Sequence, residues 1–473
     1  SAQLRAGAGL VLAAGSRIDV SGGARVAASG SLSGGAAGAI TLSSSALPSS
    51  GALDGSRFVL DGSLQGLALA GARGGSLSLR AAQVHLGDVG SAFDAAADDA
   101  ARGILRLDPG FLSQGGFNSF QLDGQQALTV HAGALLAPVA QSWMAERALL
   151  GAATGSTLSA WARPNGGALA VAPALPGQRQ PVQLSLQSTG LATSTDGGVL
   201  TVDAGARLQL EPQARLTLQA ARQLRMDGQI QAPAGQVTLA KTGFSTEALP
   251  DPAGLLSLGS SSAIDVSGQV LTVPGTDGRL RGQVLDAGSI SLRSPLLLWH
   301  AGSSIRAAGA SGLLDGSATA LFADGRQLLH GSAGTLDITL TTNPLPGGAA
   351  QPGGAVLAGS FLAPAADLPG AAGGTFRLTL AGDGQPLADG DAPAPQVVLA
   401  GAGAAGTGPA APTPAETTDA AVLDSLRGQA RISAPMLQAA GLAELLLRSS
   451  DTLVLSGAID LDLGRRITLD TPR

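Results

Sequence analysis

The chain has 473 residues, of which 44% are hydrophobic but only 3% aromatic, and its 69 glycines and 26 prolines argue against long helices. The net charge is -6, Lys241 is the only lysine and the arginines are scattered singly, so the sequence shows no basic surface that would neutralise nucleic-acid phosphates. There is no cysteine, which excludes disulfides and thiolate metal sites. Small aliphatic side chains therefore form the core, and they suit a narrow interior of constant width.

A short unit recurs along the chain: an apolar residue, any residue, an apolar residue, and then the same unit after five more positions. Glycine often closes a pair of units two positions later. The unit appears first at 10–12 and 18–20, and four successive copies run in register between Leu200 and Met226. Further pairs lie at 256–258 with 264–266, 297–299 with 305–307, and 445–447 with 453–455.

Each unit predicts a very short strand with one buried face, which is stable only when neighbouring strands repeat it. Eight residues per strand give about three strands per coil, or roughly 24 residues per turn. We therefore predict an all-β fold, a right-handed parallel β-helix, with residues 1–473 as a single shaft. We expect between ~15 and ~19 turns and a length of roughly 70–90 Å.

Two other folds share parts of this pattern. An antiparallel β-sandwich should show longer strands and hairpin signals such as Asn-Gly, and only Asn165-Gly166 fits. A disordered Ala/Gly-rich chain should have low hydrophobicity, which the recurring Leu, Val and Ile positions contradict.

Four stretches interrupt the period and are expected to be loop inserts outside the helix. Residues 92–101 and 138–151 resemble short helices, whereas the other two stretches are rich in Pro, Gly and Ala. Because loop-closure cost grows slowly with length, we expect the shaft to fold without the last stretch. The predicted inserts are 92–102, 138–181, 344–374 and 393–421.

The sequence indicates no catalytic, cofactor-binding or metal-binding residues, and we expect no enzyme and no cofactor. Gly235 to Thr242 is P-loop-like but lacks the second glycine, and 237–239 reads as a strand. Asp460 and Asp462 should share the outward face of a strand near Arg465 and Arg466, which we interpret as a solvated face. Asp383-Gly384 and Asp389-Gly390-Asp391 are interpreted as turns. The histidines are far apart and lack ligand spacing; they are His85, His131, His300 and His330.

Several strings resemble a known family. Gly-Ser-Arg-Ile-Asp-Val-Ser-Gly at 15–22 and Ala-Ile-Asp-Val-Ser-Gly at 263–268 are similar to the haemagglutinin repeats of filamentous haemagglutinins, the large exoproteins of two-partner secretion. The stretches 107–120 and 432–442, each followed by strand units, resemble the intervening segments of those proteins. The Asn-Pro-Asn motifs of the family's secretion domain are missing, and Arg163-Pro164-Asn165-Gly166 is only a superficial echo.

The resemblance implies a structural segment of a secreted or cell-surface fibre, an adhesin shaft associated with the bacterial outer membrane. The partners that it implies are an outer-membrane transporter during secretion and a host or matrix receptor. Strand units without caps at both ends favour end-to-end assembly with further copies, and the charge composition indicates no nucleic-acid partner. The alternatives are the shaft of a contact-dependent toxin-delivery exoprotein and, less favoured, a carbohydrate-active β-helix enzyme. Because Ser1 is not Met and ordinary strand units lie near both ends, we expect the piece to continue into more β-helix.

Overall fold

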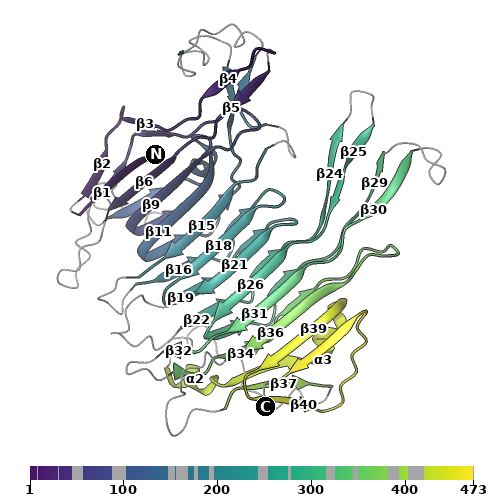
Figure 1. Cartoon of the computed structure of the whole chain (residues 1–473). Coiled ribbons are helices and arrows are strands. Elements are labelled where there is room, and N and C mark those ends of the chain that lie inside the picture. The colour runs from purple at the N-terminus through teal and green to yellow at the C-terminus, as the bar shows by residue number, and fades with distance from the viewer. Residues whose placement is uncertain are drawn as a thin grey trace.

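The structure is a computed structural model, and it shows a parallel β-helix built almost entirely of strands (Figure 1). Successive coils stack along one axis from the amino-terminal end to the carboxy-terminal end. The structure describes residues 1–7, 9–29, 31–44, 57–87, 103–146, 155, 169–174, 179–190, 197–242, 254–274, 279–315, 325–344, 350–381, 394–402 and 420–471.

The central coils show how the repeat builds the fold. Strands β16 (Val199–Val202), β17 (Arg207–Gln209) and β18 (Arg215–Ala220) complete one turn, and β19 (Gln223–Met226) begins the next. Leu200 pairs with Leu224, which lies 24 positions further along the chain, and Val202 pairs with Met226. The predicted three-sided coil of about 24 residues is confirmed here.

The strands form three faces. The first face holds twelve strands in the described part of the chain, joined in parallel register: β1 (Ala2–Ala6), β6 (Ala39–Ser44), the first part of β9 (Gly75–Leu86), the first part of β11 (Phe117–Val130), β15 (Gln183–Ser188), β18, β21 (Gln236–Lys241), β26 (Ser289–Ser294), β31 (Thr335–Leu340), β36 (Gly374–Leu380), β39 (Leu442–Ser449) and β41 (Arg466–Asp470).

The second face follows each first-face strand after a bend. It contains β2 (Gly9–Leu12), β7 (Arg57–Leu60), β10 (Ile104–Leu107), the second parts of β9 and β11, β16, β19, β22 (Leu255–Leu258), β27 (Leu296–Trp299), β34 (Gly354–Leu357), β38 (Gln429–Ser433), β37 (Gln396–Ala400) and β40 (Thr452–Ser456). The third face contains β3 (Arg17–Asp19), β8 (Ser63–Gln65), β12 (Leu135–Leu136), β17, β20 (Gln229–Gln231), β23 (Ala263–Asp265), β28 (Ser304–Arg306) and β35 (Ser360–Leu362).

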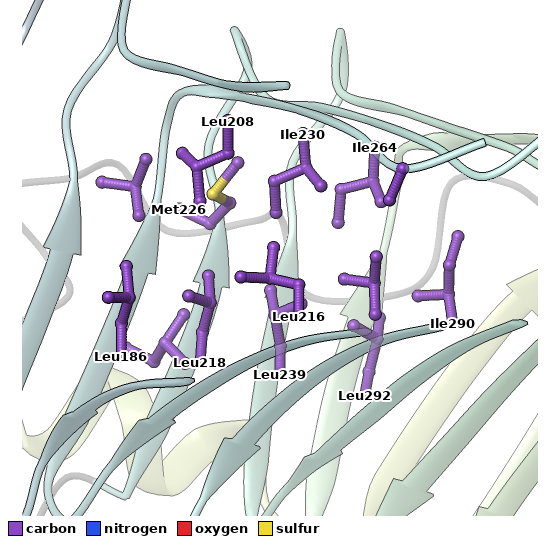
Figure 2. Close-up of a cluster of buried hydrophobic side chains, with 14 of the residues drawn as sticks. Leu186, Leu208, Leu216, Leu218, Met226, Ile230, Leu239, Ile264, Ile290 and Leu292 are labelled. Carbon is purple, nitrogen blue, oxygen red and sulfur yellow. The ribbon is translucent and has the colours of Figure 1, made fainter. Parts of the chain in front are cut away.

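Inward side chains of like type stack on one another from coil to coil (Figure 2). On the third face Leu208, Ile230 and Ile264 lie in successive strands, and each is at most 2% exposed. Burying one such side chain contributes about 1.5–3 kcal/mol. The alternating pattern is therefore what closes the narrow interior.

The shaft is shorter than the sequence suggested. Twelve first-face strands at ~4.8 Å spacing span roughly 50 Å in the part of the chain that the structure describes. The expectation of ~15 to ~19 turns is wrong because hairpins and extra strands between the coils take up many residues.

In the part of the chain that the structure describes, four antiparallel hairpins lie between a third-face strand and the next first-face strand, so they leave the shaft at the same edge. We call this edge the hairpin edge. In Figure 1 the hairpins labelled β24–β25 and β29–β30 extend away from the coils. The hairpins are β4–β5 (Ala24–Val26 and Leu32–Gly34), β13–β14 (Ser142–Ala145 and Leu169–Ala172), β24–β25 (Gln269–Pro274 and Leu280–Leu285) and β29–β30 (Ser311–Asp315 and Arg326–His330).

The predicted inserts are corrected by this arrangement. Trp143 and Met144 lie in strand β13, so the helix expected within 138–151 is wrong there. Residues 344–374 are not simply an insert, because they supply β34 and β35 to the second and third faces. Among the described residues of that stretch, the short hairpin β32–β33 (Asn343–Pro344 and Ala350–Gln351) leaves the coil. The stretch 92–102 lies outside the described residues.

The stretch 393–421 also contributes to the shaft. It contains β37, whose Val397 and Leu399 are 0% and 2% exposed, and the start of helix α2 (Ala420–Ser425). Leu423 and Leu426, in and just after α2, pack on the outside of the second face against Leu255, Leu296 and Leu298. The expectation that the shaft does not need this stretch is therefore wrong, because alternating apolar residues survive within its Pro- and Ala-rich composition.

Near each end, one second-face strand is placed out of chain order. Strand β10 pairs with β9 on the side away from β11 and contacts β7, although it follows β9 in the chain. Strand β38 likewise lies between β34 and β37, although it follows β37. At both places the chain steps back by one strand before it continues along the axis.

The two step-back segments, residues 104–116 and 429–441, are copies of one motif. A short helix follows each strand: η2 (Pro109–Ser113) after β10 and α3 (Ala434–Ala439) after β38. Leu112 and Leu437 are both 0% exposed, and Gly116 and Gly441 both have positive φ; each pair is 325 positions apart. The strand that follows each glycine has a register shift at its start, between residues 117 and 119 in β11 and between residues 442 and 444 in β39. The helices contact third-face strands β12 and β35 and so occupy a third-face position.

Candidate functional site

Two adjacent hairpins at the hairpin edge expose apolar side chains. Hairpins β24–β25 and β29–β30 contact each other, and the backbone N–H of Leu280 donates to Asp315 Oδ2 at 2.8 Å. Leu313 and Leu328 are cross-strand partners that are 55% and 51% exposed. Val273, Leu280 and Leu329 are also exposed. Exposed apolar side chains that lie close together mark interaction surfaces more often than isolated ones do.

The parallel register of β9 and β11 brings two histidines together on the outward side of the second face. His85 Nδ1 and His131 Nε2 are 2.8 Å apart, and the planes of the two rings are nearly parallel, with an interplanar angle of 9°. His85 Nε2 lies 3.2 Å from Gln83 Oε1, and His131 Nδ1 lies 3.6 Å from Asp203 Oδ2. The four side chains form a polar row that connects β9, β11 and the turn after β16.

The chemistry of this row is hydrogen bonding between neighbouring coils. Gln83 Nε2 donates to Gln126 Oε1 at 3.3 Å, which fixes its Oε1 toward His85. One ring can therefore donate to the other while His85 donates to Gln83, so the row joins adjacent strands through side chains. Across the described residues, no group of three or more His, Asp or Glu side chains is arranged to hold a metal ion.

The sequence missed the contact between His85 and His131 because 46 positions separate them. A signal was present: Val84-His85-Leu86 and Leu128-Thr129-Val130 are strand units, and their alignment places His131 beside Gly87. The other two histidines do not join the row. Burial lowers the pKa of His300, although the nearby Asp227 carboxylate opposes that shift. His330 ends strand β30.

The acidic pair near the carboxy-terminal end is arranged differently from the expectation. Asp460 and Asp462 are exposed as predicted, but they lie in an extended segment outside any assigned strand. Arg465 and Arg466 instead approach Glu444, at 3.4 and 3.6 Å. The neighbouring element at this position is helix α3, which offers no strand edge, and the backbone N–H of Asp462 donates to Oε1 of Gln438 in α3 at 2.8 Å.

The remaining sequence motifs are the P-loop-like stretch and the Asp-Gly and Asn-Gly pairs. The P-loop-like stretch contains strand β21, so the strand predicted at 237–239 is confirmed, and Lys241 is buried at its end. Both Asp-Gly stretches at 383–391 and the Asn165-Gly166 pair lie outside the described residues.

These features define a class, the parallel β-helix with lateral hairpins. No protein-family model, curated protein or solved structure matches the chain. The resemblance to filamentous haemagglutinins therefore depends on the sequence motifs alone. None of the helices in the described ranges has both the length and the apolar character needed to cross a membrane.

Proposed function

We propose that the chain is a shaft segment of a fibre exported to the cell surface, of the adhesin type that the repeat motifs suggest. The observation that carries the proposal is the unbroken first-face ladder, in which each coil is held by its neighbours while hairpins leave at one edge. A stack of this kind becomes longer by the addition of coils with the same cross-section, and the loops at its side can vary without disturbing the coils.

The same proposal names the partners and the location. An outer-membrane transporter exports the chain, a host or matrix receptor binds the hairpin edge, and copies assemble end to end. The lack of cysteine supports passage through an oxidising compartment, since no disulfide can form there before export.

Antibodies raised against the purified chain test the location. Intact cells of the source organism should be labelled at their outer surface, and external protease should remove that label. A cytosolic marker protein in the same cells provides the control. Labelling that appears only after permeabilisation would contradict the proposal.

A bead-adhesion assay tests the role of the hairpins. Beads coated with the chain should bind a matrix-coated surface more than beads coated with a variant in which 271–283 and 313–328 are each replaced by Gly-Gly. Equal binding by both kinds of bead would show that the hairpins are not adhesive.

A further inference from the structure

A cavity of about 450 Å³ lies where the second face splits near the carboxy-terminal end. Strands β34 and β38 pair at only two positions, Ala355 with Ala430 and Val356 with Arg431. Beyond these pairs the two strands separate, because β34 stays paired with β27 and β38 stays paired with β37. Ala358 N–H donates to Trp299 O on one side, and Gly401 N–H, just past β37, donates to Ser456 O on the other. The cavity is therefore a consequence of the step-back of β38.

The cavity has an aliphatic part and a polar part. The aliphatic lining is buried and comes from both sides of the second face, with Leu357 and Ile432 from the interior core and Leu426 from the cluster outside it. Small residues leave the space open, among them Ala358, Ala400 and Ala402. The volume is within the range of ligand pockets, which are mostly apolar with a few placed polar groups.

The polar part comes from alternate residues of β38. Gln429, Arg431 and Ser433 all line the cavity, and among the described residues of the lining Arg431 is the one with a formal charge and none carries a carboxylate. A guanidinium carries five N–H donors, so it can serve a ligand as well as a partner within the chain.

Comparison of the two copies of the motif explains why Ser433 is available. In the first copy Asp108 caps η2 by accepting from Gly110 N at 2.7 Å. In the second copy Ser433 holds the matching position but makes no capping hydrogen bond, because the residue corresponding to Gly110 is Pro435, which has no N–H.

We propose that this cavity binds a small aliphatic carboxylate. The carboxylate accepts hydrogen bonds from Arg431, Ser433 and Gln429, and the aliphatic tail packs against Leu357, Ile432 and Leu426. Charge-assisted hydrogen bonds are about twice as strong as neutral ones, which favours an acid over the corresponding alcohol.

Titration of the whole chain with octanoate, kept below its micelle-forming concentration, tests the proposal by calorimetry. We expect saturable 1:1 binding and at least ~10-fold weaker binding of 1-octanol. Arg431→Met should weaken octanoate binding at least ~10-fold, and Ala358→Leu should block the cavity from its exposed rim. The matched control is Arg106→Met, at the corresponding position of the first copy, which should leave binding unchanged.

Three results would overturn the proposal: no octanoate binding by the unaltered chain, equal affinity for octanoate and octanol, or unchanged affinity in Arg431→Met. Ser433→Ala provides a second, smaller change in case Arg431→Met disturbs β38. It should weaken octanoate binding several-fold while the circular dichroism spectrum stays unchanged, and unaltered binding would contradict the assigned role of Ser433.

Discussion

At the level of single residues, the wall of the helix separates inward from outward positions along each strand. In β18 Leu218 is 0% exposed, whereas its neighbour Thr217 points outward and is half-buried. We expect Leu218→Ala to lower the free energy of unfolding by about 2–5 kcal/mol through lost burial and a residual cavity. Thr217→Ala should change it by less than about 0.5 kcal/mol. Urea denaturation measures both, and similar effects would contradict the inward stacking.

Asp123 gives a pH-dependent prediction. Burial raises the pKa of Asp123, even though Arg80 Nε at 2.8 Å and Thr189 act in the opposite direction. A carboxyl whose folded-state pKa is raised contributes most stability below its unfolded pKa of about 3.9 and loses that contribution as the pH rises. Asp123→Asn should therefore be more stable, relative to the unaltered chain, at pH 7 than at pH 3.5. The opposite trend in urea midpoints would show that the Arg80 pair outweighs burial.

Asp19 is a comparison with the opposite sign. Burial alone would raise the pKa of Asp19, but hydrogen bonds from Ser21 together with Arg17 outweigh it and lower the pKa. Its contribution is present above the unfolded pKa and is lost as the pH falls through the folded pKa. Asp19→Asn should consequently lose stability relative to the unaltered chain at pH 7 and match it more closely at pH 3.5. A penalty that grew on acidification would contradict this assignment.

At the level of elements, the sequence predicts the coil well where the repeat is regular. The four units from Leu200 to Met226 give three strands and the first strand of the next coil, with the expected stacking. Prediction fails at 344–374 and 393–421, where Gly, Pro and Ala conceal short runs such as 396–400 that still bury alternate residues. Composition averages over a stretch, whereas one coil needs only a few correctly spaced apolar side chains.

The step-back motif was only partly predictable. The segments 107–120 and 432–442 both resemble the segments between the repeats of filamentous haemagglutinins, and the structure shows that the two share one motif. Their strand order could not be predicted, because a parallel strand can add to either side of its neighbour with the same inward pattern. For the same reason, the cavity beside Arg431 does not follow from the sequence alone, whereas alignment of the strand units at 84–86 and 128–130 could have placed His131 near His85.

The contrast between β37 and a hairpin gives a prediction at this scale. Deletion of 394–402 removes a strand that pairs with both β38 and β40, so the coils after residue 420 should lose protection from proteolysis. Replacement of 271–283 by Gly-Gly removes only the outer part of hairpin β24–β25 and should leave the shaft intact. Limited proteolysis with mass mapping compares the two variants. Equal protease sensitivity of the carboxy-terminal coils in both would contradict the structural role of β37.

At the level of the whole molecule, each coil contacts mainly the coils on either side, so stability should vary along the axis. In solenoids it is approximately a sum of repeat and interface terms between nearest neighbours. Inward residues of the central coils are completely buried, as Leu216 and Leu224 show at 0% exposure. By contrast, Leu4 in β1 and Leu469 in β41 are 41% and 45% exposed.

Native-state hydrogen exchange of the chain should therefore show a gradient. Amides of β16 to β21, between residues 199 and 241, should exchange most slowly, because opening there breaks the interfaces on both sides of a coil. Amides of β1 to β3 and of β40 and β41 should exchange faster, since each of those strands has one described neighbour. Leu218→Ala should accelerate exchange mainly in β15, β18 and β21, which are stacked in that order on the first face. Uniform exchange rates along the chain, or an equal effect of Leu218→Ala on every coil, would mean that the shaft unfolds as one cooperative unit rather than coil by coil.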